Sequence, residues 1–471
     1  MKKIAICFLC LCLSVNLTSN FAFATSTEVP EETTDNSQTA FDNYHGIDAQ
    51  SAMLGTRKLI DNITAGFLYE ANSQTLLYAY EADKQVYPAS LVKLMTALYA
   101  IENGNLEDIA VVSSSALATI PVDAVNVKLK VGEQMRLEDL LYCLLVSSAN
   151  DAGAVIAEHI SGDPETFVSG MNDYAQQLGC TNTTFTNPNG LHDEIQVTTA
   201  RDMARILDAA LKNEVFRKIF TSKTHRIEAT NLAGVRKLQT SNSLLDSVSK
   251  QYYDARAIGG RSGVNQDGKR CMATAAESKG MLLISIVMGS ESVYQEDGYS
   301  AIQVGGYKET TAMLDAGFKG YQTAQILYAN QALQQCKVES GDCDLVVGPN
   351  ESVRSVLPAD ATVDTLTYRY KLDNLKAPIT KGDKISDVEI WSGSMCVGVS
   401  ELYALNTVNF VDTSDAVDNA PSNRVNGSAI ITWTIVGIVL GAFVCLFVVR
   451  YLPKIRVMKR RKRLRRSRRR S

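Results

Sequence analysis

The chain has 471 residues, which is enough for two or three domains. Its 47 basic and 51 acidic residues nearly cancel, but 13 of the basic residues lie after position 449 and two follow the first methionine. The remainder therefore carries a charge near −19, which favours solubility outside the cell. The four histidines lie in no metal or triad motif, so a Ser-His-Asp enzyme is unsupported.

Residues 1–24 read as a secretory signal peptide, with Lys2 and Lys3 before an apolar run and Ala22-Phe23-Ala24 as the cleavage site. The run is too short to span a bilayer, although an uncleaved anchor is the alternative. Residues 25–50 are polar and predict a flexible linker.

Residues 51–335 alternate strand and helix patterns and predict one catalytic domain. The predicted strands are Ala65–Glu70, Thr75–Tyr80, Cys271–Ala275 and Met281–Met288. The predicted helices are Ser90–Asn103, Leu137–Leu145, Asp151–Ile160 and Gln322–Gln335.

A Ser-x-x-Lys pattern occurs twice, and its surroundings distinguish the two copies. Ser90 and Lys93 open an apolar helical segment, where positions i and i+3 share a face and bring the amine to the hydroxyl. Ser247 and Lys250 lie in a polar stretch with no such helix. A neutral Lys93 would activate Ser90, and burial together with the Arg261 cation would lower its pKa. The alternative is an N-cap serine beside an exposed lysine.

The segment Ser148-Ala149-Asn150 lies at a predicted helix boundary. Ser148 would pass a proton to a leaving amine, and Asn150 would hold Lys93 and a substrate amide. The same residue types are favoured as helix caps, so this segment alone leaves both interpretations open.

A glycine-rich segment, Gly259-Gly260-Arg261-Ser262-Gly263-Val264, can begin a strand in which a ligand backbone comes close. Arg261 and Ser262 supply a cation and a hydroxyl that suit a carboxylate, which arginine binds bidentately. The alternative is an ordinary glycine-rich surface hairpin.

The C-terminal third changes character. Residues 336–411 carry short β-branched and aromatic runs between turns and predict a small all-β domain. Cys336 and Cys343 either bridge or stay free thiols, and the cysteines outside the two apolar termini lack metal spacing.

After a polar linker, 412–428, residues 429–449 form an uncharged run that is long enough for one transmembrane helix. The basic tail 450–471 then lies in the cytoplasm by the positive-inside rule, with nucleic-acid binding as the less economical alternative. The chain is thus predicted to be a single-pass membrane protein whose catalytic domain is extracytoplasmic.

The three polar segments match the S-x-x-K, S-x-N and K-T-G triplets, with Arg261 and Ser262 in place of Lys and Thr. From about Ala49 to Val411 the chain resembles the low-molecular-mass penicillin-binding proteins of the serine-type D-alanyl-D-alanine carboxypeptidase family. Residues 87–97, 144–152, 185–191, 199–204 and 377–383 carry the likeness. The resemblance implies an α/β (α+β) transpeptidase fold, like that of serine β-lactamases, with a small all-β C-terminal domain.

The resemblance also implies removal of the terminal D-alanine from peptidoglycan stem pentapeptides, without a metal or organic cofactor. Ser90 would be the nucleophile, Lys93 its general base, and Ser148 the proton donor to the departing D-alanine. The amides of Ser90 and Val264, next to Gly263, would form the oxyanion hole. β-Lactams would acylate Ser90 as covalent inhibitors.

The third triplet departs from the family pattern. Arg261 and Ser262 would still bind the substrate carboxylate, but arginine does not readily lose a proton for a relay. Relatives commonly attach to the membrane through an amphipathic helix, whereas this chain is predicted to span it. Two alternatives to the carboxypeptidase are a degenerate homologue that binds peptidoglycan or β-lactams with weak turnover, and a β-lactamase. The sequence leaves open a preference for cross-linked peptides.

Overall fold

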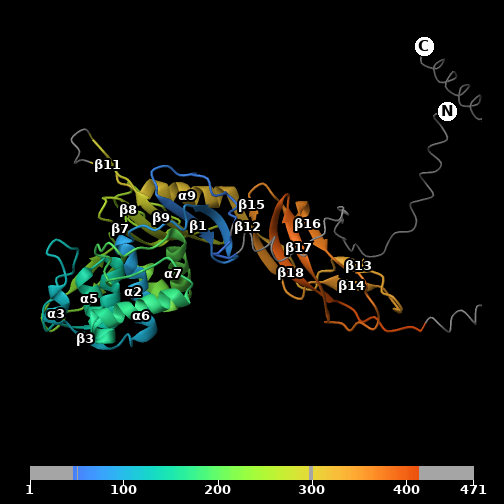
Figure 1. Cartoon of the computed structure of the whole chain (residues 1–471), viewed down its shortest axis with the longest axis horizontal. Coiled ribbons are helices and arrows are strands. Elements are labelled where there is room, and N and C mark those ends of the chain that lie inside the picture. Colours follow the sequence, from blue (N-terminus) through green and yellow to red (C-terminus); the bar gives the residue numbers. More distant parts are fainter. Residues whose placement is uncertain (1–45, 50, 296–300, 413–471) are drawn as a thin grey trace, which may run out of the picture. The chain divides into compact units, whose positions relative to one another are not determined.

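The computed structural model describes residues 46–49, 51–295 and 301–412. Its central element is a five-stranded antiparallel sheet in the order β2-β1-β9-β8-β7 (Figure 1). The strands are β1 (Ala65–Glu70), β2 (Thr75–Tyr80), β7 (Ala257–Val264), β8 (Arg270–Ser278) and β9 (Met281–Ser290). Strand β7 lies at one edge, so one side of its backbone is open to other partners.

Both faces of this sheet are covered by helices. Strand β9 is buried along its whole length, and its side chains alternate between two cores. Ile284 and Ile286 pack toward α7 (Ala200–Lys212), whereas Leu283 and Val287 pack toward α9 (Tyr307–Gly320). The domain is therefore a helix, sheet and helix sandwich.

Most of the other helices gather on the α7 side of the sheet (Figure 1). They are η1 (Ala89–Leu91), α2 (Val92–Asn103), α3 (Ser114–Ala118), α4 (Leu137–Val146), α5 (Asn150–Ser161), α6 (Pro164–Gln177) and α8 (Glu214–Phe220). Three two-stranded antiparallel sheets complete this part of the chain: β3 (Ile109–Val111) with β4 (Gln134–Arg136), β5 (Thr224–Ile227) with β6 (Arg236–Gln239), and β10 (Val293–Tyr294) with β11 (Ala301–Gln303).

The predicted small all-β domain is confirmed. Strand β12 (Tyr321–Leu327) pairs with β15 (Val353–Pro358). A five-stranded sheet runs β13 (Gln334–Cys336), β14 (Leu345–Gly348), β18 (Met395–Ala404), β17 (Lys384–Ser392) and β16 (Thr367–Tyr370), with the 3-10 turn η2 (Val363–Thr365) before it. A separate apolar core, which includes Leu345, Ile390 and Leu402, holds these strands together.

One predicted element is wrong. The segment predicted as the helix Gln322–Gln335 contains strand β12, and the helix is the preceding α9, which ends at Gly320. Strand β12 pairs with β15 from Tyr321 to Leu327. This strand pairing outweighs the helix propensity of the alanines and glutamines in the segment. A turn with Asn330 at φ 58° separates β12 from β13.

The predicted signal peptide, most of both predicted linkers, the predicted span 429–449 and the basic tail lie outside the described residues. Within the described ranges, no helix is both long enough and apolar enough to cross a bilayer. Cys336 and Cys343 are free thiols, as are the four other cysteines in this part of the chain.

Candidate active site

Ser90 lies in the tight turn η1, directly before α2. Ala89 adopts φ 50°, a left-handed conformation that is uncommon for a residue with a side chain. Leu91 rather than Ser90 occupies the N-cap of α2, and it makes no side-chain cap bond. The Ser90 side chain is therefore held in a strained turn and does not cap the helix.

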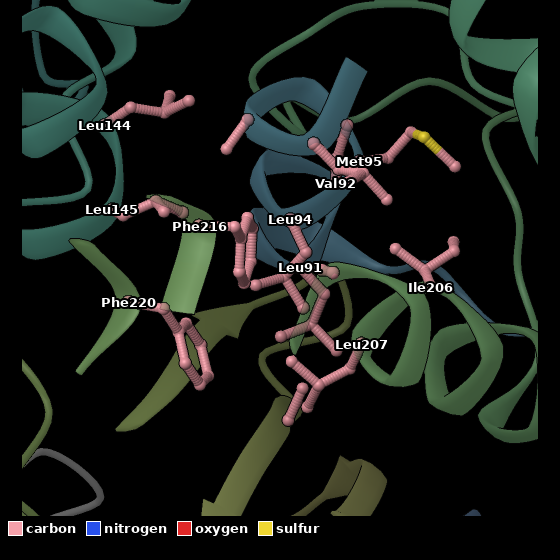
Figure 2. Close-up of a cluster of buried hydrophobic side chains, with 14 of the residues drawn as sticks. Leu91, Val92, Leu94, Met95, Leu144, Leu145, Ile206, Leu207, Phe216 and Phe220 are labelled. Carbon is pink, nitrogen blue, oxygen red and sulfur yellow. The ribbon is translucent and has the colours of Figure 1, made fainter. Parts of the chain in front are cut away.

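Lys93 is fully buried, although it carries an ionisable amine. Figure 2 shows apolar side chains of η1 and α2 packed among others from α4, α7 and α8. They are Leu91, Val92, Leu94, Met95, Leu144, Leu145, Ile206, Leu207, Phe216 and Phe220. Since Lys93 is itself fully buried, its amine takes its partners from the protein rather than from water.

Three oxygen atoms surround the Lys93 amine. Nζ donates to the Asn150 Oδ1 at 2.8 Å and to the Asn189 carbonyl oxygen at 2.6 Å, and it lies 3.4 Å from the Ser90 Oγ. Burial first, and then the Arg261 cation, hold the pKa of Lys93 well below its usual 10.5. The arrangement favours a neutral amine next to the serine hydroxyl.

Ser148 and Asn150 occupy the turn between α4 and α5. Ser148 is buried with φ 61°, and Asn150 begins α5. The Asn150 Nδ2 donates to the Val125 carbonyl at 2.8 Å, which orients its Oδ1 toward Lys93. The N-cap of α5 is Ala149, so the capping alternative does not describe Asn150.

Arg261 reaches from β7 to the end of α4. Its side chain is buried, and its Nη1 donates to the Leu145 carbonyl at 2.5 Å. Burial lowers the pKa of Arg261 to about 10. Its Nε has no hydrogen-bond partner in the part of the chain that the structure describes. A buried donor without a partner is costly.

Strand β7 approaches the serine turn very closely at Gly263. A Cβ atom at this position would lie 2.5 Å from the Ser90 backbone nitrogen, so only glycine fits. The Asn265 N–H donates toward β8, to the Lys269 carbonyl, so the N–H of the preceding Val264 points to the open edge of the sheet. Ser262 is half-buried on the same strand.

The structure thus brings Ser90, Lys93, Asn150, Arg261 and Gly263 together. Ser262 and Val264 lie on the same strand as Arg261, and Ser148 lies in the turn just before Asn150. The glycine-rich segment lies in an eight-residue edge strand of the main sheet, paired with β8, and is not the turn of a surface hairpin. The second copy of the pattern, Ser247 and Lys250, is exposed outside any helix or strand.

Sequence reasoning missed the Asn189 carbonyl as a partner of the Lys93 amine. It is a backbone group, so no side-chain type marks it. Its segment Asn187-Pro188-Asn189-Gly190 contains residues typical of a specific turn, which is the signal that was available.

Comparison with known proteins gives two family matches. A family model described as D-alanyl-D-alanine carboxypeptidase matches residues 60–292, and the model of the penicillin-binding protein 5 C-terminal domain matches residues 321–409. The D-alanyl-D-alanine carboxypeptidase DacA of Haemophilus influenzae is 31% identical over 354 residues, which are 72% of this chain and 84% of that protein. DacF of Bacillus subtilis is 28% identical over 335 residues, with 70% and 82% covered.

Among solved structures, penicillin binding protein 5 from Haemophilus influenzae is similar with a TM-score of 0.59 and 29% identity. The match covers 75% of this chain and 99% of that one. The D-alanyl-D-alanine carboxypeptidase DacD from Francisella tularensis has a TM-score of 0.60 at 20% identity, with 76% and 97% covered, which shows a shared fold.

Proposed function

Because the chain belongs to the D-alanyl-D-alanine carboxypeptidase family of serine peptidases, we propose that it cleaves the terminal D-alanine from peptidoglycan stem pentapeptides through an acyl-enzyme on Ser90. The observation that carries this proposal is the fully buried Lys93 amine, which lies within reach of the Ser90 Oγ and between two carbonyl oxygens. No other buried lysine is found among the described residues.

Burial and the Arg261 cation lower the pKa of Lys93 and so favour a neutral amine. When two N–H groups of that amine donate to the Asn150 Oδ1 and the Asn189 carbonyl, its lone pair is left for the Ser90 Oγ. Lys93 takes the hydroxyl proton while Oγ forms a bond to the scissile carbonyl carbon. The N–H groups of Ser90 and Val264 then stabilise the oxyanion.

The departing group is D-alanine. The carbon–nitrogen bond breaks while Ser148 delivers a proton to the leaving amine, and that proton originates from Lys93. Arg261 and Ser262 hold the substrate carboxylate, and the unpartnered Arg261 Nε suits this role. Arg261 keeps its proton throughout, so the relay involves Ser148 and Lys93 only. Water activated by Lys93 then hydrolyses the ester and frees Ser90.

The proposal includes the placement of the enzyme. The signal peptide 1–24 directs export, residues 429–449 anchor the protein as a single span, and the tail 450–471 stays in the cytoplasm. The linkers 25–50 and 412–428 flank the catalytic domain and the β domain, and we place the boundary between these domains before β12 at Tyr321 rather than at the predicted residue 336. The substrate would then be stem peptides of the cell wall, and β-lactams would acylate the same serine.

The test incubates purified protein with a D-Ala-D-Ala pentapeptide and assays free D-alanine. We expect release by the native protein and none by Ser90→Ala. Covalent labelling by penicillin without release from the peptide would favour a degenerate binding homologue. Rapid hydrolysis of penicillin would favour a β-lactamase.

A further inference from the structure

The shortest contact of the Lys93 amine is with a backbone atom, the Asn189 carbonyl oxygen at 2.6 Å. A backbone carbonyl cannot be removed by substitution, and its position depends on the loop that carries it. We call residues 186–191 the carbonyl loop. The side chains that hold this loop therefore determine whether the Lys93 amine stays next to the Ser90 hydroxyl.

Gln196 closes the carbonyl loop at both ends. This side chain is buried, and its Oε1 accepts the backbone N–H of Thr186 at 3.1 Å and of Asn187 at 3.3 Å. Its Nε2 donates to the Leu191 carbonyl at 2.7 Å. Gln196 thus ties the entry of the six-residue loop to its exit from outside the loop, and Asn187 within the loop donates to the same Leu191 carbonyl.

A second contact holds the middle of the loop. The Thr96 Oγ1 donates to the Pro188 carbonyl at 2.7 Å, and Thr96 follows Lys93 by three residues on the buried face of α2. Gly190, with φ 75°, presses the loop against the serine turn, because a Cβ there would lie 2.0 Å from the Ala89 carbonyl oxygen. The same helix therefore carries the base and anchors the loop that binds it.

We propose that Gln196 and Thr96 are positioning residues, which hold the Asn189 carbonyl against the Lys93 amine so that the amine's lone pair faces Ser90. This inference rests on the proposed function, in which Lys93 is the general base. It adds two residues that touch neither the substrate nor the reacting atoms.

The pH dependence distinguishes positioning from simple stability. A carbonyl binds an ammonium more strongly than an amine, so a displaced loop lowers the pKa of Lys93 further. Among the described charged groups, Arg261 from β7 opposes the protonation of Lys93. The Asp151 carboxylate on α5 is engaged elsewhere, because it accepts the backbone N–H groups of Val127 and Leu129.

The experiment compares Thr96→Val, Thr96→Ser and Gln196→Met in the full-length protein. We expect Thr96→Val and Gln196→Met to lower kcat about 100-fold per site titrated with penicillin, with KM little changed. In both variants the acid limb of kcat/KM, the pH range in which protonation of Lys93 abolishes activity, should move to lower pH. Thr96→Ser keeps the hydroxyl and restores kcat. The matched control is Asn172→Leu, because Asn172 clamps both backbone groups of Phe185 just before the loop and does not touch it.

A native kcat per titrated site and an unmoved acid limb in both variants would overturn the inference. So would an equal loss in Asn172→Leu, or no rescue by Thr96→Ser. If Gln196→Met fails to fold, the comparison of Thr96→Val with Thr96→Ser is sufficient to test the inference. Full activity in Lys93→Ala would contradict the proposed function itself, which separates the two failures.

Discussion

At the scale of single residues, the site depends on a lysine that burial makes unlike a surface lysine. The Lys93 amine is desolvated, and a second cation, Arg261, lies close enough to oppose its protonation. A base of this kind is active above its lowered pKa and becomes protonated, and thus inactive, as the pH falls through that value. The acid limb of the rate profile therefore reports the electrostatics of the site.

Replacing Arg261 tests this electrostatic coupling. Because the guanidinium lowers the pKa of Lys93, Arg261→Gln raises that pKa and moves the acid limb of kcat/KM to higher pH. Arg261→Lys keeps a positive charge and retains substantial activity, within about tenfold, since it loses little beyond one hydrogen bond. Profiles of kcat/KM for both variants check the prediction. Complete inactivity of Arg261→Lys would show that guanidinium geometry is essential.

At the scale of secondary-structure elements, the site exists because the edge strand β7 lies against the serine turn η1. Gly263→Ala would place a methyl group 2.5 Å from the Ser90 backbone nitrogen and force the two elements apart. We expect acylation by labelled penicillin to slow by about 100-fold or more, because small displacements near the reacting atoms are costly. Gly234→Ala is the control, since a Cβ there meets no atom within 4 Å. Native acylation in Gly263→Ala would contradict the prediction.

Local patterns predicted the elements that carry the site. The strands Ala65–Glu70 and Thr75–Tyr80 have the predicted bounds, and the helices before and after Ser148 differ from the prediction by at most one residue at either end. Regular burial periods and clear turn residues explain this success. The helices α6 and α7 were not predicted, although Asp163 and Thr199 cap them in the usual way.

What local patterns miss is contact between distant positions. The Lys93 amine binds a carbonyl 96 residues away, and the Leu145 carbonyl accepts from an arginine 116 residues away. Neither acceptor is a side chain, so no residue type announces it. The prediction for the β12 segment was wrong for a related reason, because its conformation is determined by its pairing with β15. The motifs predicted which side chains gather, and the tertiary fold supplied the groups that orient them.

At the scale of the whole molecule, one buried ion pair outside the site links two distant parts of the chain. Arg236 bonds to both carboxylate oxygens of the fully buried Glu133, and its Nε donates to the Val127 carbonyl. Desolvation opposes ionisation of Glu133, but hydrogen bonds from Arg236 and Thr230 hold its pKa below the usual 4.5. The pair therefore stabilises the fold above the unfolded pKa, and this contribution is lost as pH falls through the lowered value.

Removal of Arg236 leaves a buried carboxylate without its partner. Arg236→Met should destabilise the protein at pH 7 by about 3–5 kcal/mol, and the deficit should shrink at low pH, where Glu133 is neutral in both states. Urea unfolding at the two pH values measures this difference. The control Arg226→Met removes an exposed arginine that pairs with the exposed Glu228 and should cost well below 1 kcal/mol. Equal deficits at both pH values would exclude the buried charge as the cause.

The proposed single span predicts how the chain responds to extraction from the membrane. Residues 429–449 are 21 uncharged residues, about 31 Å as a helix, which matches the hydrocarbon core. The 13 basic residues that follow can also bind anionic lipid, but that attraction is screened by salt. We therefore expect the full chain to stay in the membrane fraction through a 1 M salt wash, where the Debye screening length is about 3 Å.

A chain ending at Gly427 should be soluble and cleave soluble pentapeptide at the native rate, because all the described contacts of the site lie before residue 410. Release of the full chain by salt alone would show that the tail, and not a span, holds it.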